Sequence, residues 1–144
     1  MIRKLIAIVC MLTMVVALPA QKRKMSKIEF EKLTHNFGTI YEKDGDAVCK
    51  FRFVNVGKTP LVILRAQASC GCTVPTYPER PIAVGDTAEM TVVYKTMGRP
   101  GEFAKNIYVY TNTNPDRTVL QIKGVVQPKS PDDEPASVRK VQLK

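Results

Sequence analysis

Two cysteines separated by one glycine form the most reactive motif of this sequence. Cys70, Gly71 and Cys72 stand in the run Ala-Ser-Cys-Gly-Cys-Thr-Val-Pro. Residues i and i+2 of an extended chain face the same side, so both sulfurs point together. The pair therefore suits a strained, easily reduced disulfide, a soft metal such as Cu(I), or part of a zinc site.

Cys49 and His35 are the further residues that a zinc site at this motif would require. A zinc site needs four ligands, and Cys49, Cys70, Cys72 and His35 are the candidates for a Cys₃His set. Cys49 can also pack as a small, inert hydrophobic residue. His35, the single histidine, stands in Thr-His-Asn-Phe-Gly with no nucleophile motif nearby, so we expect a turn or surface role.

A hairpin prediction brings Cys49 near the pair. If the turn at 57–59 reverses the chain, Phe53 faces Leu64 and Cys49 faces Ala68. Cys70 then lies diagonal to Cys49, roughly 7 Å away at the backbone. A Cys49–Cys70 disulfide thus remains open beside a Cys70–Cys72 bond. Of the four cysteines, Cys10 lies in the N-terminal apolar run, and the three that follow it leave one unpaired in a monomer.

The elements that carry these residues are β-strands, because hydrophobic residues alternate with polar ones from Ile28 onward. We expect strands within 28–33, 47–53, 61–68, 90–94, 105–110 and 118–126, separated by turns rich in Gly, Pro and Asn. Six or seven short strands in about 100 residues predict an all-β, immunoglobulin-like antiparallel β-sandwich of about seven strands. The predicted core residues are Phe51, Phe53, Val62, Leu64, Val92, Ile107, Val109, Leu120 and Ile122.

Both ends of the 144-residue chain differ in composition from this domain. Residues 1–20 have a basic start, an apolar run and small residues near Ala20, which is typical of a secretory signal peptide. Residues 21–27 form a basic leader, 28–127 the domain, and 128–144 a Pro-rich and acidic tail predicted to be disordered. Export predicts a periplasmic or secreted protein with no transmembrane span in its mature chain.

The charge and motif content excludes several function classes. The formal net charge is +9, but export makes nucleic acid an improbable partner. Asp44-Gly45-Asp46 lacks the remaining ligands of a calcium loop and indicates a turn. Tyr108 and Tyr110 alternate with apolar neighbours, so one pair faces solvent as a binding strip or as ordinary sheet packing. We expect no enzyme activity and no cofactor, with copper as the alternative.

Several ordered motifs resemble a known family. They are residues 51–57 (Phe-Arg-Phe-Val-Asn-Val-Gly), 60–63, 69–73, 81–86 and 99–105. Together they are similar to the bacterial domain-of-unknown-function family 1573, over about residues 30–126. The resemblance implies an exported Ig-like fold, Hydin-like or sperm-protein-like, without an established activity. The family's Cys-Gly-Cys matches Cys70 and Cys72, whereas its pattern demands no cysteine at Cys49.

Two functions are consistent with these observations. One is an exported, non-enzymatic Ig-like module that binds another envelope protein or supports the envelope. The other is a periplasmic thiol-redox or copper-handling protein that uses Cys70 and Cys72.

Overall fold

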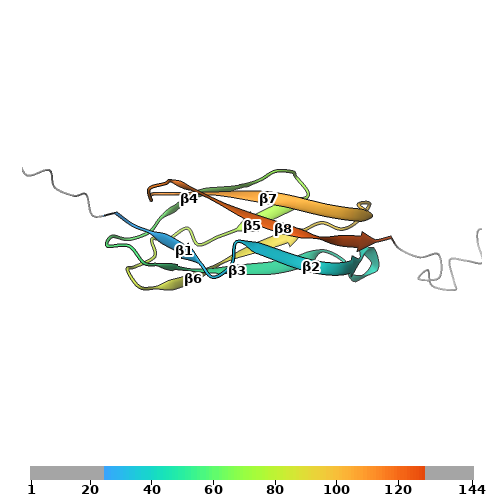
Figure 1. Cartoon of the computed structure of the whole chain (residues 1–144), viewed down its shortest axis with the longest axis horizontal. Coiled ribbons are helices and arrows are strands. Elements are labelled where there is room, and N and C mark those ends of the chain that lie inside the picture. The colour runs from blue at the N-terminus through green and yellow to red at the C-terminus, as the bar shows by residue number, and fades with distance from the viewer. Residues whose placement is uncertain (1–24, 129–144) are drawn as a thin grey trace, which may run out of the picture.

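Two four-stranded β-sheets pack face to face in the computed structural model, which describes residues 25–128 (Figure 1). The eight strands are β1 (Ile28–Phe30), β2 (Thr34–Tyr41), β3 (Ala47–Asn55), β4 (Ile63–Ala68), β5 (Thr73–Thr76), β6 (Thr87–Tyr94), β7 (Gly101–Thr111) and β8 (Arg117–Gln127). One sheet has the order β1-β3-β6-β5 and the other β2-β8-β7-β4. The helical content of this part is one 3-10 turn, η1 (Glu42–Asp44), so no described helix could span a membrane.

The predicted all-β sandwich is confirmed, with two strands that the sequence did not indicate. β2 contains the residues expected to form a turn around His35, and β5 directly follows the Cys-Gly-Cys motif. β2 pairs parallel with β8, whereas the other strand pairs are antiparallel. The register of β2 shifts between Asn36 and Thr39. There Gly38 has a φ of +65°, and its N–H donates to Asn36 Oδ1 at 2.9 Å, so a local turn is built into the strand.

The predicted hairpin between 47–53 and 61–68 is wrong. β3 pairs with β1 and β6, and β4 lies in the opposite sheet beside β7. Phe53 faces Ala88 and Phe30 instead of Leu64, and Cys49 faces Val92 instead of Ala68. Alternation shows which residues of a strand share a face, but it does not say whether the next strand stays in the same sheet. The segment 56–62 crosses from one sheet to the other.

Two of the predicted core residues are wrong for a related reason. Leu64 is 62% exposed and Val62 is half-buried, whereas Leu61 and Ile63 are buried. The pairing of β4 with β7 is irregular between Ile63 and Arg65, which inserts one extra residue. Such a bulge reverses the inward and outward phase of the strand, so Leu64 points to solvent.

The remaining predicted core residues line the space between the sheets. They are the buried Phe51, Phe53, Val92, Ile107, Val109, Leu120 and Ile122. Tyr94 and Phe103 close one end of this core with stacked rings whose centroids are 3.9 Å apart. Alternating positions of β3, β6, β7 and β8 thus supply most of the apolar interior.

A buried amide joins the loops at the opposite end. The Asn55 side chain is fully buried; its Nδ2 donates to the carbonyls of Thr59 (2.9 Å) and Ile82 (3.0 Å). Its Oδ1 accepts from the N–H of Gly57 at 3.0 Å. Because buried polar groups need partners, this one side chain holds the crossover and the segment before β6 together.

The N-terminal residues of the described chain dock beside this amide. A Cβ on Gly57 would collide with the backbone of Ser26 and Lys27, so only glycine permits this approach. Ser26 is buried, and its hydroxyl donates to Asn112 Oδ1 at 2.8 Å. Met25–Lys27, which the sequence analysis assigned to the leader, therefore pack as part of the sandwich.

Replacing Phe53 and Leu64 separately tests the strand assignment. We expect Phe53→Ala to lower the free energy of unfolding by about 3–5 kcal/mol, because it empties a fully buried site. Leu64→Ala should change it by less than about 0.5 kcal/mol, since that side chain is exposed. Urea unfolding of both variants provides the measurement. Equal losses would restore the hairpin and contradict this register.

Replacing Asn55 tests whether its side chain holds the crossover and the segment before β6 together, an interaction that we call the amide clamp. Asn55→Ala removes one hydrogen-bond partner each from the Thr59 carbonyl, the Ile82 carbonyl and the Gly57 N–H. The Ile82 carbonyl keeps its bond from the Leu61 N–H, so we expect a loss of about 2–3 kcal/mol. Asn36→Ala is the matched control, because that exposed amide serves one local turn. We expect the control to cost less than about 1 kcal/mol in the same denaturation experiment. Similar costs for both variants would argue against the clamp.

Candidate functional site

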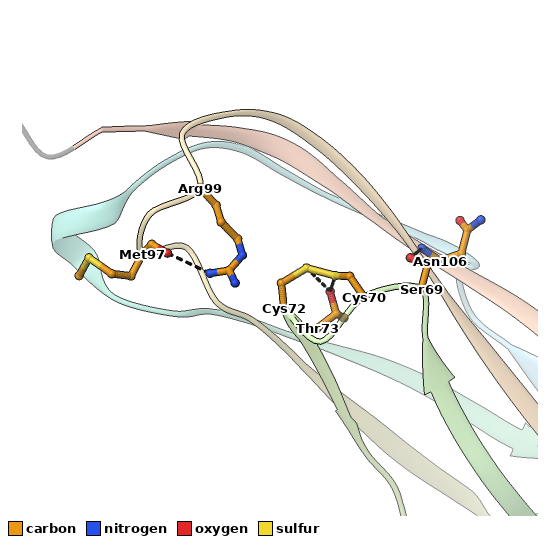
Figure 2. The surroundings of a disulfide bond; sticks show 7 residues. All are labelled: Ser69, Cys70, Cys72, Thr73, Met97, Arg99 and Asn106. Carbon is orange, nitrogen blue, oxygen red and sulfur yellow. Dashed lines mark hydrogen bonds between the residues drawn. A yellow bond between two sulfur atoms is a disulfide. The ribbon is translucent and has the colours of Figure 1, made fainter.

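The Cys-Gly-Cys motif forms a disulfide-closed loop between β4 and β5. Cys70 and Cys72 are bonded to each other, with their Cα atoms 5.3 Å apart (Figure 2). The motif follows the end of β4 at Ala68 and precedes β5 at Thr73, at the strand-end position that the sequence predicted. Of the two pairings left open by the sequence, the structure has Cys70–Cys72.

Hydrogen bonds hold this loop against both sheets. The Cys72 carbonyl accepts from the N–H of Lys95 at 2.8 Å, beyond the end of β6. The N–H of Ser69 donates to the Asn106 carbonyl of β7 at 2.9 Å. The loop thus bridges the two layers at the rim of the sandwich.

The two sulfurs differ in accessibility. Cys72 is only 6% exposed, whereas Cys70 is half-buried and is the sulfur that an incoming thiol could reach. The Thr73 hydroxyl lies 3.6 Å from the Cys70 sulfur and 3.8 Å from that of Cys72. Figure 2 shows the Arg99 side chain extending toward the disulfide while its Nη1 donates to the Met97 carbonyl at 2.9 Å. The Thr73 hydroxyl would be placed to donate to a thiolate if the bond were reduced.

Cys49 lies apart from this loop as a free, buried thiol on β3. Its cross-strand neighbour Val92 belongs to β6, and Val92 pairs on its other side with Pro75 of β5. β6 therefore separates Cys49 from the strand that follows the disulfide. Burial raises the pKa of the Cys49 thiol to about 11, opposed by the positive charge of Lys32. At neutral pH this thiol is protonated and unreactive.

The four residues considered for a zinc site do not assemble. His35 lies on β2 in the opposite sheet from Cys49, and Cys70 and Cys72 are bonded to each other. Within residues 25–128, no group of three or more His, Cys, Asp and Glu side chains could hold a metal ion. His35 Nδ1 lies 2.8 Å from Lys32 Nζ and accepts a hydrogen bond from it. Partial burial, and then the charge of Lys32, lower the pKa of His35.

A second feature lies on the outer face of the β2-β8-β7-β4 sheet. Ile107 and Val109 are buried, so Tyr108 and Tyr110 of β7 project outward. Tyr110 pairs with Arg65 of β4 on one side and Arg117 of β8 on the other. We call Arg65, Tyr108, Tyr110 and Arg117 the Arg–Tyr face.

Both arginines of the Arg–Tyr face stack on the tyrosines. The Arg65 guanidinium lies 3.9 Å from the Tyr110 ring centroid, and that of Arg117 lies 5.8 Å from the Tyr108 centroid. An open hollow of about 400 Å³ adjoins them, lined by Gln67, Ala68, Ser69, Tyr108, Tyr110 and Arg117. The sequence indicated the tyrosine strip but not the arginines, because their proximity depends on which strands flank β7.

Comparison with known proteins agrees with the fold and leaves the activity open. The profile of a family described as "Protein of unknown function (DUF1573)" matches residues 28–126. The curated proteins contain no match to the sequence.

Solved structures share the architecture at low sequence identity. A protein of unknown function from Porphyromonas gingivalis W83 superposes with a TM-score of 0.64 and 13% identity, over 76% of this chain and 51% of that chain. The chain thus spans about half the length of that relative. The ASH/PapD-like domain 7 of human CEP192 has a TM-score of 0.57 and 13% identity, over 78% of this chain and 93% of that domain. The Vibrio cholerae VesB protease has a TM-score of 0.55 and 11% sequence identity, over 70% of this chain and 32% of the protease. These likenesses show a PapD-like, Ig-like fold.

The small size of the disulfide loop predicts a small contribution to stability. A loop of three residues gives about 1.6 kcal/mol by loop-closure entropy. We therefore expect the double variant Cys70→Ser, Cys72→Ser to lower the free energy of unfolding by about that amount in urea. The matched control is the wild-type protein treated with a reductant, which should lose the same amount.

Alkylation under native conditions checks the assignment of the three thiols. Protein without residues 1–20, and therefore without Cys10, should take up no label when oxidised. After reduction the half-buried Cys70 should react first, because Cys72 and Cys49 are both buried. Labelling of Cys49 in folded, oxidised protein would contradict this arrangement.

Proposed function

Because the chain belongs to the DUF1573 family of proteins of unknown function, its role has to be inferred from its surface; we propose an exported, non-enzymatic module that binds another protein of the cell envelope. The observation that carries this proposal is the Arg–Tyr face. Two arginines lie over two tyrosine rings on the outer side of the sheet, and Arg117 and both tyrosines also line an open hollow. Tyr and Arg are the residues most enriched at protein interfaces and their energetic centres.

The charge of the Arg–Tyr face supports a binding role over a structural one. Charged side chains are paired on the other sheet, where Glu89 bonds Lys50 at 2.8 Å and Arg52 at 3.4 Å. No described carboxylate lies within ion-pair distance of Arg65 or Arg117. Their guanidinium donors are directed to solvent and are open to an external acceptor.

Export is part of the proposal. The apolar run that predicts a signal peptide, residues 1–20, lies outside the described residues, as do residues 129–144 of the predicted tail. The Cys70–Cys72 disulfide supports a periplasmic or secreted location, because such bonds persist in oxidising compartments.

The disulfide favours a second candidate function, thiol–disulfide exchange with an external dithiol. In that reaction a thiolate of the dithiol attacks the Cys70 sulfur and releases Cys72 as a thiolate. The second thiol then resolves the mixed disulfide, so the protein gains two electrons and the dithiol becomes a disulfide. Copper handling would need the same reduction first, because Cu(I) is bound by thiolates.

Equilibration in thiol redox buffers, followed by alkylation and mass spectrometry, separates the two candidates. A structural bond should have a reduction potential below about −300 mV, and an exchange-active one between about −120 and −270 mV. A reduction potential between about −120 and −270 mV would favour the redox function over the binding function.

Site-specific photo-crosslinking in intact cells tests the binding function. We expect p-benzoylphenylalanine in place of Gln67, on the rim of the hollow, to give a discrete cross-linked product in the cell envelope. The matched control places the same residue at Glu29, exposed on β1 of the opposite sheet. Products of equal yield at both positions, or none at Gln67, would refute the proposed role of this face.

A further inference from the structure

We propose that the Arg–Tyr face binds an extended acidic segment of a partner protein, with two carboxylates held by Arg65 and Arg117. This inference rests on the proposed function and specifies the chemistry of its partner. The two guanidinium groups come from strands on either side of β7, and each is held over a tyrosine ring of that strand. Stacking leaves the edges of a guanidinium free to donate two parallel hydrogen bonds to a carboxylate.

The spacing of the arginines fits alternate residues of an extended chain. Arg65, Tyr110 and Arg117 form one row across three adjacent strands, so the two arginine Cα atoms lie roughly 10 Å apart. Carboxylates at positions i and i+2 of an extended segment lie about 7 Å apart at the backbone and point to the same side. Long side chains on both partners make up the difference between these two spacings. A segment with acidic residues at alternate positions therefore matches Arg65 and Arg117.

The hollow has room for side chains of such a segment. Its volume of about 400 Å³ extends from Arg117 along Tyr108 to Ser69, beside the disulfide loop. Gln67 and Ser69 offer hydrogen-bonding groups at the edge, and the tyrosine rings offer apolar contact area. A lipid surface is a poorer match, because polybasic membrane sites cluster about four to eight cations.

The chain's own acidic segment is poorly placed to occupy both arginines within one molecule. Asp132, Asp133 and Glu134 follow β8, which begins at Arg117 and ends at Gln127. Ten residues of strand separate Arg117 from Gln127 by about 33 Å, whereas the seven residues from Gln127 to Glu134 span at most about 25 Å. An acidic segment of another molecule is therefore the better match to both arginines.

Titration of isotope-labelled protein with a defined peptide provides the test. The probe is a seven-residue peptide that alternates glutamate with valine, and its glutamine counterpart is the peptide control. We expect amide shifts to concentrate on β4, β7 and the start of β8, with affinity falling as salt is added. Arg65→Gln and Arg117→Gln should each weaken binding about threefold or more, and together about tenfold or more.

Arg52→Gln is the matched control variant, because Arg52 lies on the opposite sheet beside Glu31 and Glu89. It should leave the affinity unchanged. Equal weakening by Arg52→Gln, or equal binding of the glutamine peptide, would overturn the proposal. Failure of the peptide to bind, while Gln67 still cross-links a partner, would refute the acidic segment and leave the binding function standing.

Two further outcomes would assign the face to a different occupant and overturn the proposal. One is binding of anionic phospholipid vesicles with the same dependence on Arg65 and Arg117, without peptide binding. The other is self-association that is lost when residues 128–144 are deleted, which would identify a second copy as the partner.

Discussion

The buried Asn55 side chain is the constraint on which the arrangement of the two sheets depends. It ends β3 and holds the crossover at Thr59 and the segment at Ile82 through both of its amide atoms. Only connecting segments of the chain join the layers of this sandwich covalently, so the route of such a segment must be stabilised by specific contacts. An amide that satisfies three backbone groups in an apolar surrounding accepts one geometry only.

This crossover determines what the outer surface presents. Because β4 leaves the sheet of β3 and pairs with β7, Arg65 comes beside Tyr110. The bulge at Leu64 then turns Arg65 and Gln67 outward and leaves the smaller Ala66 on the core side. A clamp in the interior and one extra residue in an edge strand thus produce the candidate binding surface.

The two candidate sites differ in how far the sequence could predict them. Cys70 and Cys72 are two residues apart, so their proximity is local and the motif alone placed the two sulfurs together, with a disulfide among the chemistries left open. The arginines of the Arg–Tyr face are 52 positions apart in the chain, at residues 65 and 117, and no local pattern relates them. In the family motif at residues 51–57, Asn55 and Gly57 serve the contacts of the Asn55 amide and the docking of Ser26.

The sequence by itself determined the alternation of the strands, most of the core and the position of the Cys-Gly-Cys motif at a strand end. Each of these follows from a period of two within one strand, where the faces of neighbouring residues are set by local geometry. Only the tertiary structure decided that β3 and β4 lie in different sheets, that β2 runs parallel to β8, and that Cys49 stays unpaired. Strand pairing joins segments distant in the chain, and the same alternation is compatible with several partners. Burial of the whole interior, together with the Asn55 amide, selects one of them.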